Sequence, residues 1–386
     1  MGQATDFDKL RRKRRRGRLI RRIAVLVAVL LGALIVLSLN DMLVDVGVLH
    51  YINDFFADFG GDGYPIPAPG GTLRDAKSLG ANIAILNDTN LFIYNKRGKE
   101  LQGVQRMNDG TILLTAGGRA LTYDVGSARF RLFSRSNILL EGESEYAITS
   151  AALGRKGNYA IVTSHKQFTA QATVFDPAFE LEFQWSSNEL VAGLALSPDG
   201  DSMAAGCVGA QGGVLCSTVL LFSFDRQNEI ARLEFMDELL LHLEYVSDKK
   251  VGVLTDRGYH IMDDTGKLAA SRSFGGERLV ESRFEGGAAL LLCENPESRT
   301  QTIILLDKNG AELGVLRTGI RVRDMQLGAR EVYLLTEEGI AVYDMELSHK
   351  QTVEAGGVMR ILLAADTLYC LTPEQIYIVD TGTNQN

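Results

Sequence analysis

The segment Glu331–Asp344, EVYLLTEEGIAVYD, decides the fold of this chain. It consists of an apolar run, a tight turn and a second apolar run that ends in an acid. The same phrase returns as VGVLTDRGYHIMDD at Val251–Asp264 and as TLYCLTPEQIYIVD at Thr367–Asp380. Short apolar runs bounded by Gly, Asp and Asn predict β-strands joined by turns. No long helical pattern interrupts these runs after residue 73.

Eight copies of the phrase can be counted from residue 73 onward. Repeats of about forty residues with about four strands each are typical of a β-propeller. Each small sheet is apolar on both faces and can bury those faces only against neighbouring sheets. The sequence therefore predicts an all-β propeller at 73–380 and a polar tail at 381–386. The copies end at Asn95, Asp124, Asp176, Asp225, Asp264, Asp307, Asp344 and Asp380.

The spacing of these closing residues leaves the number of blades open. The separations are 29, 52, 49, 39, 43, 37 and 36 residues, so the first copies are irregular. Seven and eight blades both remain possible on this count. The last copy stops after its third strand, so a strand from outside must complete that blade. Residues 73–79, LRDAKSL, are the expected donor.

The N-terminus predicts a membrane anchor. Residues 23–39 carry no charge and are rich in Leu, Val, Ile and Ala; with residues 19–22 they are long enough to span a bilayer. We therefore expect a transmembrane helix at 19–39, with Leu19, Ile23, Leu30 and Leu39 as anchor residues. A cleaved signal peptide is the alternative, but its apolar region is usually shorter and ends at a small-x-small site. The positive flank consists of Arg11, Arg12, Lys13, Arg14, Arg15, Arg16, Arg18, Arg21 and Arg22.

Charge asymmetry predicts the orientation of this anchor. Basic flanks stay in the cytoplasm. We therefore expect residues 1–18 to form a cytoplasmic tail and the propeller to lie on the other side of the membrane, outside the cytoplasm. Residues 1–22 hold ten of the 40 basic residues and two of the 48 acidic ones. The remaining chain therefore has 30 basic and 46 acidic residues, a net charge of −16. This balance argues against nucleic acid as a partner and leaves the bilayer and proteins of the membrane or envelope.

Residues 40–72 are predicted to connect the anchor to the propeller. Apolar and acidic positions alternate at helical spacing over 41–59, which indicates an amphipathic helix. Such a helix either lies on the membrane or packs on the following domain. The Gly- and Pro-rich stretch that follows suits a stalk.

Three features together resemble an uncharacterised family of bacterial, single-pass membrane-anchored propeller proteins, found mostly in Firmicutes. They are the Arg-rich start with its apolar anchor, the phrase Gly61-Asp62-Gly63-Tyr64-Pro65-Ile66, and the degenerate repeats behind it. The repeat rhythm is also similar to WD40-like and quinoprotein-like propellers. The resemblance implies architecture and location, and it implies no activity.

The sequence offers no candidate catalytic, cofactor-binding or metal-ligating residues. The five histidines are scattered, and no Gly-x-Ser-x-Gly, phosphate-binding loop or His-Glu-x-x-His occurs. A quinone-dependent dehydrogenase is the enzyme class with this fold, but the single Trp185 does not match its Trp-rich blades. We therefore expect a protein without enzymatic activity and without a cofactor.

Cys207 and Cys216 lie in one copy, on either side of an eight-residue Gly-rich loop. Outside the cytoplasm two such residues could face each other across a hairpin and form a disulfide. They could equally be two small buried side chains. The sequence leaves both open.

Two functions agree with this reading. The first is a binding or scaffolding module in the cell envelope, with the segment 206–213 as a contact. The second is a propeller that binds, or binds and processes, a small molecule or glycan in its central funnel. Converging acids with exposed rings in the funnel would favour the second function, and an apolar patch on the rim would favour the first.

Overall fold

The computed structural model describes residues 27, 54, 56–106, 108 and 110–381. The chain divides into two units, 1–55 and 56–386, and the second contains all the strands of the described residues. The predicted anchor at 19–39, apart from Val27, and most of the predicted helix at 41–59 lie outside the described residues. Among the residues that are described, no helix is long and apolar enough to cross a membrane.

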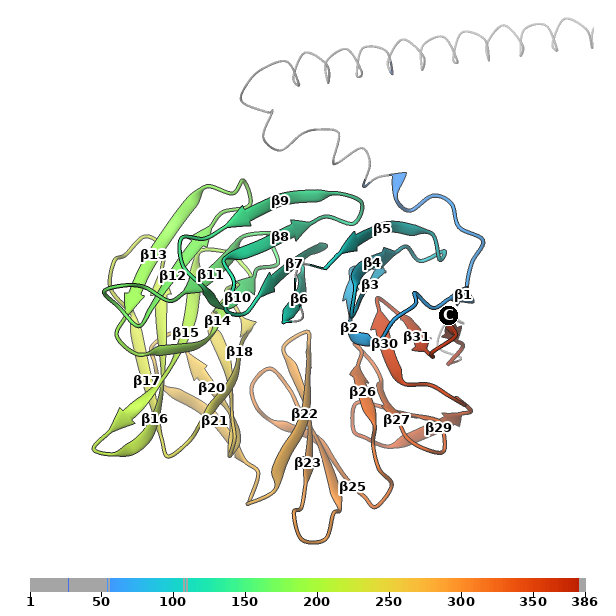
Figure 1. The fold of residues 1–386 in the computed structure, drawn as a ribbon. Coiled ribbons are helices and arrows are strands. Elements are labelled where there is room, and N and C mark those ends of the chain that lie inside the picture. The colour runs from blue at the N-terminus through green and yellow to red at the C-terminus, as the bar shows by residue number, and fades with distance from the viewer. Residues whose placement is uncertain (1–26, 28–53, 55, 107, 109, 382–386) are drawn as a thin grey trace, which may run out of the picture. The chain divides into compact units, whose positions relative to one another are not determined.

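The described chain forms eight four-stranded antiparallel sheets arranged around a common axis, so the eight-bladed alternative is confirmed (Figure 1). We number the sheets as blades 1 to 8 in chain order. Blades 1 to 4 contain β2 (Leu73–Leu79), β3 (Asn82–Asn87), β4 (Asn90–Tyr94), β5 (Glu100–Gln105); β6 (Thr111–Ala116), β7 (Arg119–Asp124), β8 (Arg129–Phe133), β9 (Ile138–Glu143); β10 (Ile148–Leu153), β11 (Tyr159–Thr163), β12 (Ala170–Phe175), β13 (Leu181–Ser187); and β14 (Leu190–Leu196), β15 (Ser202–Gln211), β16 (Val214–Ser223), β17 (Ala231–Met236).

Blades 5 to 8 repeat this order, except that the final strand of blade 8 comes from the N-terminal side of the chain. They contain β18 (Leu240–Ser247), β19 (Lys250–Thr255), β20 (Gly258–Asp263), β21 (Leu268–Ser273); β22 (Arg278–Glu285), β23 (Ala288–Glu294), β24 (Gln301–Leu306), β25 (Glu312–Thr318); β26 (Asp324–Leu327), β27 (Val332–Leu335), β28 (Ile340–Tyr343), β29 (His349–Val353); and β30 (Arg360–Ala364), β31 (Thr367–Leu371), β32 (Gln375–Val379), β1 (Ile66–Pro67).

The hydrophobic core is divided among the seams between blades. Each apolar cluster contains side chains from two consecutive blades, and one cluster joins blade 8 to blade 1. The middle strands are buried on both faces, as in β3 and β24, where every residue is buried. No blade can therefore bury its apolar surface alone, which is why the repeats form a closed ring.

The strand that closes the ring is not the one predicted. Residues 73–79 form β2, the innermost strand of blade 1, while β1 pairs with β32 and completes blade 8 (Figure 1). The prediction that a strand from outside the last copy completes the last blade is confirmed, but this strand is β1 and not residues 73–79. The boundary at residue 73 was also wrong, because Ile66 and Pro67 lie inside the predicted stalk.

The phrase at 61–66 holds the closing strand in place. Gly63 N donates to Arg97 O over 2.9 Å, and Tyr64 Oη donates to Asn95 O over 3.1 Å. The Tyr64 ring meets Tyr369 of β31 edge-on at 5.0 Å. Gly61 has φ +104°, and a Cβ there would lie 2.3 Å from Arg97 O, so only glycine fits. The family-like phrase therefore joins blade 1 to blade 8.

The closing residues of the first copies are irregularly spaced because Asp124 in blade 2 does not occupy the same strand position as the other closing residues. Asp124 ends β7, the second strand of its blade, whereas Asp176 and Asp307 follow the third strand. The position equivalent to these acids in blade 2 is Ser134, after β8. Its hydroxyl accepts the N–H of Asn137 over 3.1 Å, which closes the same turn without an acid. In blade 5 the equivalent acid is Asp263, and not Asp264.

One acid-closed turn recurs between the third and fourth strands. In this turn one side-chain oxygen accepts the N–H groups two and four residues ahead. In Asp307 these are Asn309 N and Ala311 N, both at 2.8 Å. Burial raises the pKa of Asp307, but the N–H groups of Ala311 and Asn309 outweigh it and bring the pKa below its ordinary value. The same turn occurs at Asn95, Asp176, Asp263 and Asp344.

Replacing Asp307 by alanine should lower the free energy of unfolding by about 1 kcal/mol at neutral pH, because two backbone donors lose their acceptor. The native pKa of Asp307 is depressed, so its contribution exists above the unfolded pKa and disappears as pH falls through the native pKa. The difference from wild type in urea unfolding should therefore shrink at about pH 3. Asp307→Asn keeps the acceptor and is the control. An equal loss at both pH values would contradict this role.

Candidate functional site

The innermost strands share a local distortion that shapes the centre of the ring. In blades 1, 3, 4, 5 and 6 the pairing register of the first strand skips one residue near its start. Such bulges redirect the side chains that follow them and are common beside functional sites. The residues directly after the bulges are Asp75, Ser150, Gly193, His242 and Glu281, and all of them line the central channel.

The central channel has a volume of about 1410 Å³ and is lined by the first strand of every blade. Its two sides differ in chemistry. Blades 2 to 4 contribute mostly small side chains, among them Ala116, Ser150, Ala152, Ala192, Gly193 and Ala195. Blades 5 to 8 and blade 1 contribute the charged groups Glu244, Glu281, Arg283, Glu285, Asp324, Arg360, Asp75 and Lys77. We call these the small-residue wall and the charged wall.

Most of the charges from blade 6 to blade 1 pair across seams. Arg283 contacts Glu281 on its own strand and reaches Asp324 of blade 7, with Nη2 3.0 Å from Oδ1. The other carboxylate oxygen of Asp324 accepts Ile361 N of blade 8 over 2.9 Å. Arg360 and Asp75 join blade 8 to blade 1 at 3.2 Å. This part of the charged wall therefore holds the ring together.

Glu244 in blade 5 is different, because its carboxyl lacks such a partner. Its Oε1 is enclosed and forms no hydrogen bond of normal geometry among the described residues, although the Tyr259 hydroxyl lies beside the carboxyl. Burial raises the pKa of Glu244 to about 8, and Arg155 opposes that rise. His242, two residues earlier, stacks on Phe284 with ring centres 4.9 Å apart. The surrounding protein, with Lys77, lowers the pKa of His242 to about 4.

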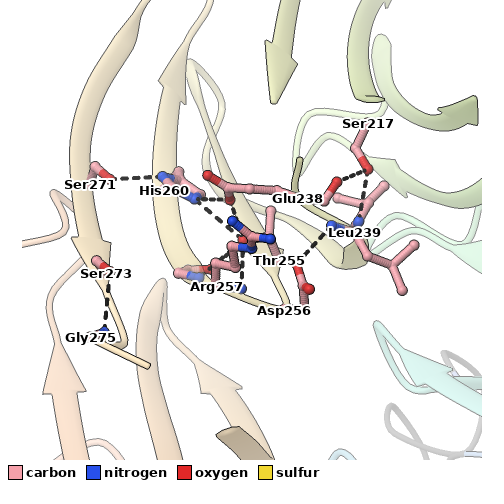
Figure 2. A network of polar contacts seen from close by, with 12 residues as sticks. Ser217, Glu238, Leu239, Thr255, Asp256, Arg257, His260, Ser271, Ser273 and Gly275 are labelled. Atoms are coloured by element: carbon pink, nitrogen blue, oxygen red, sulfur yellow. Dashed lines mark hydrogen bonds and ion pairs between the residues drawn. The ribbon is translucent and has the colours of Figure 1, made fainter. Parts of the chain in front are cut away.

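A second polar cluster contains the residue types of a hydrolytic triad. Figure 2 shows His260 between Glu238 and Ser271, with Nε2 3.0 Å from Glu238 Oε2 and Nδ1 2.9 Å from Ser271 Oγ. Thr255 also donates to the same Glu238 oxygen, over 2.5 Å. Ser217 of blade 4 donates to Glu238 O over 2.7 Å and accepts Leu240 N over 2.9 Å.

The position of this cluster indicates a structural role. Ser271 lies on β21, the outermost strand of blade 5, and is not among the residues that line the channel. His260 is buried, and Glu238 belongs to the connection between blades 4 and 5. The network therefore fixes the seam between these two blades. A nucleophilic serine also needs a substrate cleft with oxyanion donors, and the described contacts supply neither here.

The hairpin of β15 and β16 projects beyond the rest of blade 4. On one side of the hairpin, β14 pairs with β15 only as far as Val208. On the other side, the last backbone hydrogen bond to β16 runs from Asp237 N to Leu215 O. The two strands continue to a two-residue turn at Gly212 and Gly213. The segment 209–214 thus has unpaired edges. The apolar side chains Val214, Leu215, Met236 and Leu239 are 36–46% exposed at and beside this tip.

This hairpin also corrects the expectation for the cysteines. The segment 206–213 is mostly strand, and Cys207 lies opposite Thr218, not Cys216. Cys216 is therefore a diagonal neighbour, at a Cβ separation beyond what a disulfide tolerates. Both thiols are free and buried, as are those of Cys293 and Cys370. The alternative of two small buried residues is the one that agrees with the structure.

The remaining predicted site residues lie outside the described chain or are scattered. The anchor residues Leu19, Ile23, Leu30 and Leu39 and the positive flank from Arg11 to Arg22 fall outside the described residues. Within the described part, no group of three or more His, Cys, Asp or Glu is placed to hold a metal ion. The charged wall was missed, although its acids and bases stand close together in the segment RLVESRFE at 278–285. That signal becomes readable only once this segment is known to be an innermost strand.

Comparisons with known proteins give structural likenesses and a family. No curated protein matches the chain. The solved structures that resemble it include Kuenenia stuttgartiensis hydrazine synthase, with 12% identity, a TM-score of 0.48, and coverage of 71% of this chain and 96% of that one. A chain of the mitotic checkpoint complex has 11% identity, a TM-score of 0.45, and coverage of 83% and 96%. Similarity at this level says nothing of activity or partner.

The family comparison is more direct than these structural likenesses. It agrees with the expectation of a propeller family without an established activity, while bacterial group and membrane attachment stay predictions. The matching model spans residues 70–379, from the connection after β1 to the end of β32. The chain therefore belongs to the family of unknown function DUF5711.

Proposed function

We propose that this protein is a non-catalytic protein-binding module, tethered to a membrane by residues 19–39, with its propeller outside the cytoplasm. The observation that carries the proposal is the projecting hairpin of blade 4. Its tip presents unpaired strand edges together with exposed apolar side chains. Soluble proteins usually shorten, cover or charge such edges because they pair with other chains. An uncovered edge with Val214 and Leu215 beside it is therefore a contact surface.

The charges around the tip define the partner. Glu189, Asp237 and Asp256 are exposed near it, and Arg257 is paired with Asp237 at 2.8 Å. The local surface is therefore an apolar centre with a largely acidic border. A complementary protein has an apolar contact and a basic rim, which gives specificity and a faster encounter at low salt.

The membrane tether supports the same reading. The nine positive charges before the apolar segment favour a cytoplasmic N-terminus and an exported propeller. A tether limits the partner search to proteins of the membrane and envelope and raises their effective concentration.

Site-specific photo-crosslinking in intact cells tests this function. A photoreactive residue at Val214 should give a discrete adduct, whereas the same residue at Leu268, exposed on the outer strand of blade 5, should not. Adding Leu215→Asp should lower the Val214 adduct about tenfold, because interface anchors dominate affinity. The full chain should remain with membranes after alkaline carbonate extraction, and a chain that begins at residue 56 should be released. Equal adducts at both positions, or none at Val214, would refute the hairpin as the contact.

A further inference from the structure

Blades 5 and 6 place two acids in the channel that form no ion pair between blades. Glu244 and Glu285 line the channel from neighbouring blades, and among the described residues neither forms an ion pair, unlike Glu281 and Asp324. One oxygen of Glu244 is enclosed and forms no hydrogen bond of normal geometry among the described residues. Burying a carboxyl lowers the folding stability unless a hydrogen-bond or ionic partner offsets the lost contact with water. The geometry therefore points to a ligand.

Aromatic rings stand beside these acids. His242 and Phe284 both line the channel and stack on each other, and Tyr259 lies 6.0 Å from Phe284 behind them. Gly252, opposite Glu244 on β19, makes room for Tyr259, since a Cβ at this glycine would lie 2.2 Å from the Tyr259 hydroxyl. Acids combined with aromatic faces favour organic cations, which gain both ionic and cation–π attraction.

The charges nearest Glu244 favour a positively charged group, and Lys77, which acts on the neighbouring His242, limits that preference to a single charge. The charged groups that act on Glu244 are Arg155, from the turn between β10 and β11, and Glu285, from β22. When Glu244 is ionised, these three groups have a net charge of −1. A monocation neutralises them, whereas an anion meets two carboxylates.

The neighbouring part of the channel accommodates the rest of the ligand. The small-residue wall begins at blade 4, next to blade 5 with its Glu244, and continues through blades 3 and 2 with Ala, Gly and Ser side chains. Such a wall leaves space and offers mainly apolar contact, and its hydrogen-bond donors, among them Ser150 and Arg155, are few.

We propose that the channel binds an organic monocation, with its ammonium group at Glu244 and Glu285 beside the His242 and Phe284 rings and its apolar chain along the small-residue wall. Binding holds Glu244 in its charged form. Since burial keeps the pKa of free Glu244 raised, the complex releases a proton near neutral pH, and affinity increases as pH rises from about 6 to 8. An alkyl ammonium group stays charged over this range.

Isothermal titration calorimetry of the purified propeller, residues 56–386, with hexylamine tests the proposal after circular dichroism has confirmed that this part folds. Hexylamine should bind saturably, while hexan-1-ol and hexanoate should bind at least about tenfold more weakly, since each lacks the cation. Titrations in two buffers with different ionisation enthalpies should show release of up to about one proton per hexylamine at pH 7.

Three variants separate a specific site from general attraction. Glu244→Gln should weaken hexylamine binding about tenfold and abolish proton release, and Glu285→Gln should weaken binding without abolishing release. Asp366→Asn removes another carboxylate that lines the channel, from blade 8, and should change affinity less than about twofold. Equal affinity for hexan-1-ol, unchanged binding by Glu244→Gln, or an equal loss with Asp366→Asn would overturn the proposal.

Discussion

Tyr64→Ala should lower the free energy of unfolding by about 3 kcal/mol, a typical loss for a large aromatic side chain in a packed site. Tyr64 lies in the segment that provides the closing strand β1 and contacts both ends of the ring. Its ring packs on Tyr369 of blade 8, and its hydroxyl bonds Asn95 of blade 1. Urea unfolding followed by circular dichroism measures the loss.

Two controls separate ring closure from ordinary packing. Tyr64→Phe keeps the ring and should lose only about 1 kcal/mol, the contribution of one hydrogen bond. A chain that starts at residue 56 should unfold like the full propeller, while one that starts at residue 70 lacks β1 and should be destabilised at least as much as Tyr64→Ala. Equal stability of the two truncated chains would show that β1 does not close the ring.

Asp324→Ala should be the second large effect, with a loss of about 3–5 kcal/mol, as found when one partner of a buried ion pair is removed. Asp324 is 3% exposed and joins three blades. It pairs with Arg283 of blade 6 at 3.0 Å and accepts Ile361 N of blade 8 at 2.9 Å. Its loss leaves the buried Ile361 N–H without an acceptor. It also removes one of the two carboxylates that neutralise the charge of Arg283.

Thermal and urea unfolding should place Asp324→Asn between wild type and Asp324→Ala. The amide keeps an acceptor for Ile361 N but loses the charge that faces Arg283. Asp366→Ala, at an exposed carboxylate of the same channel, should change the free energy of unfolding by less than about 0.5 kcal/mol. A loss as small as this for Asp324→Ala would contradict its role as a link between blades.

The propeller could be predicted because its evidence is local. Apolar runs such as Ile303–Leu306 and turn acids such as Asp307 act within a few residues of one another. The blade count was less certain, because Ser134 replaces the acid in blade 2 and a hydroxyl closes the same turn. A search for acids alone therefore assigned Asp124 to the wrong strand and distorted the first spacings.

The closing strand and the disulfide could not be decided in this way. β1 contains two residues and a proline, so it has no strand pattern of its own, and its pairing with Ile376 is more than 300 residues away in sequence. The pairing of Cys207 with Thr218 depends on a two-residue turn. A shift of one residue in that turn would place different side chains opposite each other.

The sequence by itself determined the strands, the turns between them and the need for a ring, because hydrophobic burial and turn chemistry depend on neighbouring residues. Only the tertiary structure decided which strands are innermost, and therefore which charges meet in the channel. Asp75 and Arg360 are 285 positions apart and come within 3.2 Å only when the ring closes. The unpaired Glu244 is likewise visible only after its neighbours are placed, because burial and pairing are properties of the assembled blades.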